Sequence, residues 1–251
     1  MDRNSSNDVS QTRKVFEDVI VADVRKFFDQ GQYDKCLVSV DNALKKHLLD
    51  ETRIILLCRK TLCYMKLNKF EKAEETLKKE ALTIETEIGS SSHRTIYAQF
   101  VYLYGDWADS YVDSPDKKKY YQDLCLEWID RCFKNGEKTR YFLHNSMGDI
   151  MCDRENYKDA LKAYNQAIRI QPKDFWAYRG IANVNFKMQK FDQSIKFYDQ
   201  AISALEEKNK SSKKGFVARR RAFADIEKMK ESREKVLESL LVSSQERLGS
   251  P

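Results

Sequence analysis

The chain is poor in the residues that build tight turns. Its 251 residues include only three prolines and eight glycines. An all-β sandwich needs many tight turns, so this composition favours helices. Hydrophobic residues make up 41 % of the chain and charged residues 33 %, a balance that supports a buried core. The sequence therefore predicts one or two helical domains, or one short solenoid.

Long hydrophobic runs are also missing. The longest, IILLC, covers residues 54–58, far short of the roughly 18 residues that a membrane-spanning helix needs. The first residues, MDRNSSNDVSQTRK, are polar and lack the apolar stretch of a secretory signal. We therefore expect no membrane insertion, a disordered tail over 1–12, and a cytoplasmic location with the nucleus as the alternative.

Motifs of metal binding and catalysis are absent. The chain has three histidines, and its six cysteines form no CxxC pair. They are expected to be small buried apolar residues in a reducing compartment. There is no glycine-rich phosphate loop, no GxSxG and no HExxH. The sequence predicts no metal site, no cofactor and no enzymatic activity.

What the chain does contain is a 34-residue repeat. NYKDALKAYNQAI (156–168) aligns with KFDQSIKFYDQAI (190–202), and each copy keeps aromatic and small residues in fixed register. Self-similarity at such a period indicates stacked helix pairs, because one pair alone cannot bury its apolar faces. We expect helices over 142–153 and 157–170, then over 176–188 and 191–206. Pro172 would end the first pair, and Asp174 would cap the helix that follows.

Weaker copies of the repeat occur upstream. GQYDKCLVSVDNAL (31–44) and NKFEKAEETLKKEAL (68–82) keep an aromatic and a small residue in the same order. Residues 13–88 are therefore expected to hold two degenerate units, with first helices over about 15–29 and 52–66.

The next segment, 93–136, is rich in aromatic residues and longer than one repeat. We expect an irregular helix pair there. Its second helix would have Ser114 as N-cap, Pro115 as the first helical residue and Gly136 just past the last turn.

Taken from Tyr141, the first well-matched unit resembles a tetratricopeptide repeat. That family has small residues at its eighth, twentieth and twenty-seventh positions, aromatics at the seventeenth and twenty-fourth, and proline at the thirty-second. This unit has, in the same places, Gly148, Ala160, Ala167, Tyr157, Tyr164 and Pro172. The unit from Phe175 matches less fully and lacks the proline; its corresponding residues are Ala182, Ser194, Ala201, Phe191 and Tyr198.

The resemblance implies an all-α fold, a right-handed superhelical solenoid of helix pairs. Residues 141–208 would form two well-matched units and 209–242 a basic C-terminal capping helix, followed by a disordered tail over 243–251. In this family the first helix of each pair lines a concave groove that binds a partner. The groove residues implied here are Asn145, Asp149, Arg179, Asn183 and Phe186. The aromatic segment 97–128 is an alternative surface, which would bind a partner helix.

Some co-chaperones of this family hold the terminal carboxylate of heat-shock chaperones in a clamp. The clamp begins with a basic residue and an asparagine four positions later, the spacing of Arg179 and Asn183. The family normally has lysine in the first place, and the rest of the clamp needs two more repeats than this chain has.

The net charge of +6 is concentrated near the C-terminus. From Lys208 onwards there are 12 Lys and Arg against 6 Asp and Glu, whereas the preceding residues carry 33 of each sign. A basic cluster without an internal acid stands out: Lys208, Lys210, Lys213, Lys214, Arg219, Arg220 and Arg221. It suits a nuclear-import signal, an acidic partner or RNA phosphates, or a solvated turn with no binding role.

The sequence thus predicts a non-catalytic adaptor or scaffold that binds a protein partner as a peptide or helix. The alternatives are an RNA-binding repeat protein that uses the basic cluster, and a chaperone-associated co-chaperone.

Overall fold

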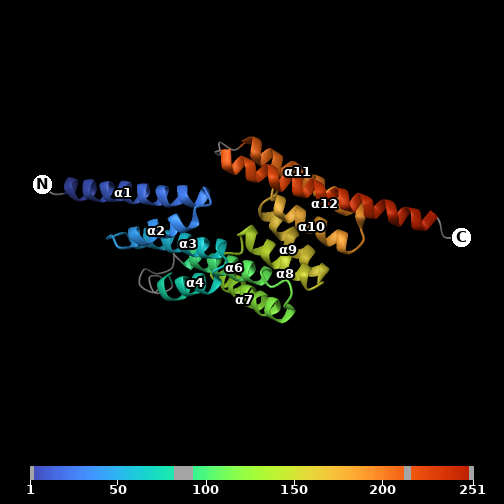
Figure 1. The fold of residues 1–251 in the computed structure, drawn as a ribbon, viewed down its shortest axis with the longest axis horizontal. Helices are drawn as coiled ribbons and strands as arrows, with labels where there is room; N and C mark the ends of the chain where they lie inside the picture. The colour runs from blue at the N-terminus through green and yellow to red at the C-terminus, as the bar shows by residue number, and fades with distance from the viewer. Residues whose placement is uncertain (1–2, 82–92, 212–215, 249–251) are drawn as a thin grey trace. The chain divides into compact units, whose positions relative to one another are not determined.

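The computed structural model describes the backbone of residues 3–81, 93–211 and 216–248, and the side chains of 14–80, 95–210 and 224–245 (Figure 1). Every regular element in these ranges is a helix, which confirms the predicted all-α fold. No helix within them is long and apolar enough to cross a membrane. Contacts divide the chain into two compact units, Met1–Glu137 and Lys138–Pro251.

Unit 1 is built from helix pairs that pack in chain order. α3 contacts its neighbours on both sides, and the last two helices form the most extensive pair. The elements are α1 (Arg3–Asp29), α2 (Tyr33–Leu44), α3 (Asp50–Lys66), α4 (Phe70–Glu75), a π-helix η1 (Thr76–Ala81), α6 (His93–Asp109) and α7 (Pro115–Lys134).

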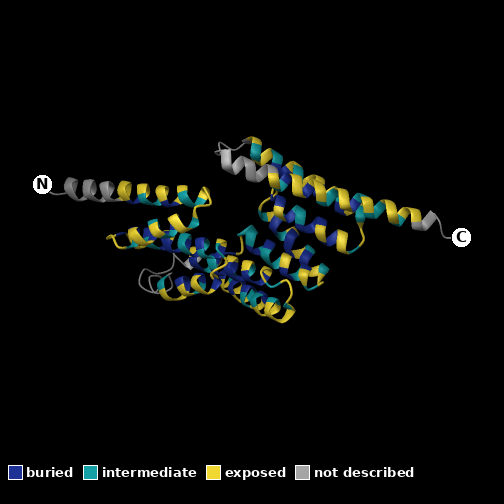
Figure 2. Ribbon diagram, viewed as in Figure 1, coloured by how far each residue is buried: buried dark blue, intermediate teal, exposed yellow. Residues whose placement is uncertain are grey.

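Unit 2 contains the two well-matched repeats and the C-terminal helices. Each successive helix packs on the one before, and α8 also touches α10. Figure 2 shows that its helices bury one face and expose the other. The elements are α8 (Tyr141–Asp153), α9 (Tyr157–Ile170), α10 (Phe175–Lys187), α11 (Phe191–Ser211) and α12 (Phe216–Leu248).

One turn recurs after five of these helices. A residue with a left-handed backbone follows the last turn, and the next N–H bonds to a carbonyl five positions back, the Schellman arrangement. Examples are Asn156 N to Met151 O at 2.9 Å and Lys190 N to Asn185 O at 2.8 Å. The left-handed residues are Gly31, Asn68, Gly136, Glu155 and Gln189. In four of the five turns an aromatic residue follows two positions later, so the turn sets the register of the repeat.

Helix extends into both of the tails that the sequence predicts, 1–12 and 243–251. α1 begins at Arg3 and α12 continues to Leu248, and residues 1–2 and 249–251 lie outside the described residues. Polar residues can lengthen a helix that packing has already nucleated, because each added residue forms a new backbone bond at little cost. The stretch 3–12 contains no proline or glycine to stop it.

The second helix of the second pair changes type along its length. α4 ends at Glu75 and a π-helix follows. At the junction the Thr76 hydroxyl donates to the carbonyl of Lys72 at 2.8 Å. Such a bond competes with the backbone ladder, which favours a change of helical pitch. The rest of this predicted unit, 82–88, lies outside the described residues.

Tyr164 of α9 is the centre of the first core of unit 2. Its ring is 2 % exposed and lies between two glycines, Gly148 of α8 and Gly180 of α10, whose α-carbons face it closely. Ala160 and Ala182 are also fully buried. Small residues thus let these helices approach each other and the aromatic ring fill the space between them, as the repeat pattern predicts for Gly148, Ala160 and Ala182.

The aromatic segment of unit 1 forms a stacked interior. Phe100 lies 3.9 Å from Trp128, and Trp107 lies 4.2 Å from Tyr121, between ring centres. The rings of Phe100, Trp107 and Trp128 are buried. The buried rings of the segment 97–128 therefore pack α6 against α7, while other residues of the segment are exposed. Tyr120, Tyr102 and Val112 are its exposed large residues.

Candidate functional site

α10 carries an unusual stripe along one face. Trp176, Arg179, Asn183 and Phe186 are three, four and three positions apart, and this spacing places them in one line on a helix. The two aromatic ends are exposed, Trp176 at 41 % and Phe186 at 38 %. We call these four residues the α10 stripe. It combines two apolar anchors, one cation and one amide.

Arg179 is held in place by stacking. Its guanidinium carbon lies 4.2 Å from the centre of the Trp176 ring, a distance typical of a favourable cation–π contact. Within the described residues it forms no ion pair, and its buried Nε has no hydrogen-bond partner. A guanidinium can donate five hydrogen bonds, so the terminal nitrogens of Arg179 are chemically suited to bind an anion.

Two tyrosine hydroxyls flank this cation. Tyr164 donates to Asp149 Oδ1 at 2.6 Å, and Tyr198 donates to Asn183 Oδ1. Burial raises the pKa of both tyrosines, and the nearby charge of Arg179 acts in the opposite direction on each. The bond from Tyr198 fixes the Asn183 side chain and leaves its Nδ2 as a donor toward solvent.

Asn145 belongs to the interior more than to the surface. It is only 8 % exposed, and its Nδ2 donates to Asp174 Oδ2 at 2.5 Å. Asp174 in turn accepts from the backbone N–H of Trp176 at 3.3 Å, which confirms it as the N-cap of α10. Burial raises the pKa of the Asp174 carboxyl, while the bond from Asn145 lowers it. Asn145 therefore joins α8 to the N-cap of α10, the helix that carries the stripe.

Comparison with known proteins agrees with this architecture. The family model described as TPR repeat matches residues 148–189. The chain contains a tetratricopeptide repeat at these residues. It is 29 % identical over 83 residues to a TPR repeat-containing protein of Methanocaldococcus jannaschii; that alignment covers 33 % of this chain and 14 % of the relative, so the chain matches about one seventh of the relative's length.

Two solved structures share the tetratricopeptide fold over most of the chain. One is a thermophilic TPR protein from Thermus thermophilus, with a TM-score of 0.58, 17 % identity, and coverage of 84 % of this chain and 98 % of that one. The other is a signal transduction ATPase with numerous domains and a tetratricopeptide repeat sensor, from Pyrococcus horikoshii. Its TM-score is 0.60 at 15 % identity, and the match covers 90 % of this chain and 35 % of that one. At these identities the likeness concerns the fold alone.

The structure places the predicted groove residues in two groups. Arg179, Asn183 and Phe186 lie together on the stripe, and Asp149 is exposed on α8 with its carboxylate tied to Tyr164. Asn145 is the buried exception. Sequence reasoning missed Trp176, although its position three residues before Arg179 places it on the same helical face.

The basic cluster is described only at its beginning. Lys208 and Lys210 are exposed on α11, and the ammonium of Lys208 lies 5.2 Å from the centre of the Phe175 ring. The other five members lie outside the residues whose side chains are described. No contact therefore bears on the RNA-binding alternative.

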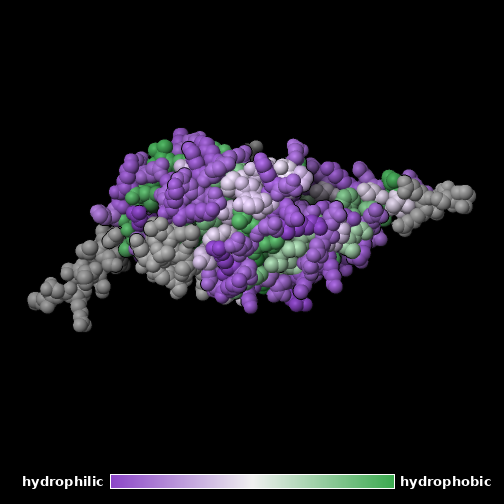
Figure 3. Space-filling model, turned by 90° about the horizontal axis from the view of Figure 1, so that it is seen from below, coloured by the Kyte–Doolittle hydropathy of each residue, from purple (hydrophilic) through white to green (hydrophobic). Residues whose placement is uncertain are grey.

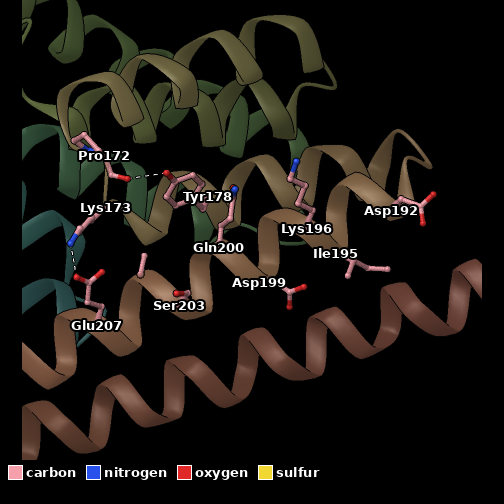
Figure 4. Close-up of a pocket in the computed structure, with 11 residues that line it drawn as sticks. Pro172, Lys173, Tyr178, Asp192, Ile195, Lys196, Asp199, Gln200, Ser203 and Glu207 are labelled. Atoms are coloured by element: carbon pink, nitrogen blue, oxygen red, sulfur yellow. Dashed lines mark hydrogen bonds and ion pairs between the residues drawn. The ribbon is translucent and has the colours of Figure 1, made fainter.

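An open cleft of about 600 Å³ lies along α11, on another side of α10 from the stripe. Figure 4 shows the Tyr178 ring over it and an ion pair at one end. Tyr178 donates to the Pro172 carbonyl at 2.9 Å, and Lys173 pairs with Glu207 at 2.5 Å. Ile195 and Ala204 contribute apolar side chains to its lining. The lining mixes both charge signs and selects no single class of ligand.

Neither the surface nor the thiols of the described residues present a further reactive site. On the face drawn in Figure 3, hydrophobic residues form small areas separated by hydrophilic ones. All six cysteines are buried, as predicted, and none of them forms a disulfide. Burial raises the pKa of Cys58 to about 12. Within the described residues no group of acidic, histidine and cysteine side chains could hold a metal ion.

Proposed function

We propose that the chain is a non-catalytic adaptor whose second unit binds a segment of a protein partner along the α10 stripe. The observation that carries this proposal is the pair of exposed aromatic side chains, Trp176 and Phe186, on either side of Arg179, which has no ion pair within the described residues. Aromatic and arginine side chains are the residues that most often dominate binding energy at protein interfaces. A tetratricopeptide array is also a scaffold whose curved surface typically serves interaction.

Partner capture from cell extract tests this proposal. Full-length chain and the double variant Trp176→Ala/Phe186→Ala would be compared by pull-down and mass spectrometry. A partner of the stripe should be depleted about tenfold or more with the variant, because each truncation removes a contact of hot-spot size. Titration of a purified fragment of that partner against both chains would then measure the loss directly.

A matched control removes exposed side chains elsewhere. Tyr120 is 59 % exposed and Val112 is 83 % exposed, both in unit 1. The variant Val112→Ala/Tyr120→Ala should leave capture unchanged. If it, and not the stripe variant, lost the partner, the aromatic segment of unit 1 would be the binding surface and the proposal would be wrong.

A further inference from the structure

Along the α10 stripe a cation and an amide lie between two aromatic side chains, and this order limits which partner segments fit it. We propose that it selects an extended partner segment in which one acidic side chain lies between two apolar residues. This inference rests on the proposed function and specifies the partner's chemistry.

The acidic residue follows from the state of Arg179. The guanidinium has no counter-ion within the described residues, and its Nε is buried without a partner. A carboxylate can accept from the two terminal nitrogens of the guanidinium at once, a paired geometry that arginine favours. Stacking on Trp176 keeps the guanidinium plane in place before binding, which lowers the entropy lost on association. One positive charge matches one carboxylate better than it matches a dianionic phosphate.

The position of the anchors indicates an internal acidic residue instead of a chain end. Along a helix rising 1.5 Å per residue, Trp176 lies about 4.5 Å from Arg179 and Phe186 about 10.5 Å away on the other side. Because exposed rings lie on both sides of the cation, a bound chain has contacts to make in both directions. An extended peptide advances about 3.3 Å per residue. The apolar residues should therefore lie one or two positions from the acid on one side and about three on the other.

The extended conformation follows from Asn183. Its Oδ1 accepts from the Tyr198 hydroxyl, so the free group beside Arg179 is the Nδ2 donor. Backbone carbonyls are the acceptors that an extended segment offers along its length, whereas a helix uses its own carbonyls internally. An amide donor in the middle of the stripe thus suits a strand-like chain.

Calorimetric titration of synthetic peptides against the full-length chain tests the inference. Peptides of about ten residues span the stripe of about 15 Å. The first peptide carries leucine, glutamate and leucine, with the short spacing before the glutamate and the long spacing after it. The second has the long spacing first. The third has glutamine in place of glutamate, and the fourth has serine in place of both leucines. Glutamine and serine replacements should each weaken binding about tenfold or more, the size expected for loss of a charged hydrogen bond or an apolar anchor.

Variants of the chain complete a double-mutant cycle. Arg179→Gln should weaken the glutamate peptide by the same factor as the glutamine replacement, and the two changes together should cost no more than either alone. Arg169→Gln on α9, an exposed arginine outside the stripe, should leave binding unchanged. Circular dichroism of both variants should match the parent chain.

The outcomes separate this inference from the proposed function. The motif is wrong if neither leucine–glutamate–leucine peptide binds, or if the glutamine peptide binds as well as the glutamate peptide. If Trp176→Ala/Phe186→Ala still loses the natural partner in that case, the stripe remains the docking surface. If the stripe variant also keeps its partner, both proposals are wrong. Tight binding that depends on a free C-terminal carboxylate would overturn the internal acid and favour a terminal clamp.

Discussion

The contact between Tyr164 and its two glycines allows a quantitative test of the core of unit 2. A Cβ added at Gly180 would lie 2.3 Å from Tyr164 Cε1, and one added at Gly148 would lie 2.6 Å from the same atom. Carbon atoms in favourable contact are about 3.5–4.0 Å apart, so both substitutions create an overlap of about 1 Å. The ring cannot withdraw easily, because it is 2 % exposed and its hydroxyl is bonded to Asp149.

Two opposing terms set the expected size of the effect. Overpacking a core costs about 1–3 kcal/mol, and replacing a helical glycine by alanine returns about 1 kcal/mol of helix propensity. For Gly180→Ala the cost should lie at the upper end, so the free energy of unfolding should fall by about 1–2 kcal/mol. Gly148→Ala should have the same sign and a smaller effect, because its contact is 0.3 Å longer.

Gly105 of α6 is the matched control. It is also helical, but an added Cβ would meet nothing within 4 Å. Gly105→Ala should raise stability by about 0.5–1 kcal/mol. Urea denaturation followed by circular dichroism measures all three variants. If Gly180→Ala stabilised the chain as Gly105→Ala does, the close packing around Tyr164 would be refuted. In Tyr164→Leu, where the ring is gone, Gly180→Ala should no longer destabilise.

Three further predictions concern other parts of the chain. Glu17 is buried and accepts hydrogen bonds from Leu49 N at 2.9 Å and from the Thr52 hydroxyl at 2.5 Å. In urea denaturation, Glu17→Ala should therefore lower the free energy of unfolding by about 1–3 kcal/mol. Asp18 is its exposed neighbour, and Asp18→Ala should change that free energy by less than about 0.5 kcal/mol. The six buried thiols should resist a thiol-specific reagent at pH 8 in the folded chain and all react in denaturant; labelling of the native chain would contradict their burial. The pKa of Asp174 is raised above 3.8 in the folded state, so the native state binds this proton more readily than the unfolded state. Its contribution to stability should thus fall as pH rises from 3.8 through the folded pKa, and stability curves of Asp174→Asn against pH should be flatter than those of the parent chain.

The sequence is most informative where the repeat is strongest. α9 covers Tyr157–Ile170, the range that the pattern predicts, because Asn156 and Pro172 mark its ends with side-chain chemistry. Glu155 and Gln189 adopt a left-handed backbone although neither is a glycine, so the sequence alone does not predict this conformation. The turns at these residues are closed by backbone hydrogen bonds from Asn156 N to Met151 O and from Lys190 N to Asn185 O.

The binding face is harder to predict, because exposure depends on distant neighbours. Asn145 occupies a groove position by register, but a carboxylate 29 residues away draws it into the interior. Trp176 resembles a core residue in composition, yet Phe175 takes the buried place beside it and leaves it outside. Such outcomes follow from three-dimensional packing, which single-sequence spacing does not contain.

The three tryptophans differ in their surroundings in a way that makes them separate optical probes. Trp107 and Trp128 of unit 1 are buried, whereas Trp176 of unit 2 is 41 % exposed. Emission from the first pair should be blue-shifted and protected from iodide, and emission from Trp176 should be red-shifted and quenched. Excitation of the unlabelled chain can therefore follow the melting of unit 1 and the occupation of the α10 stripe within one spectrum.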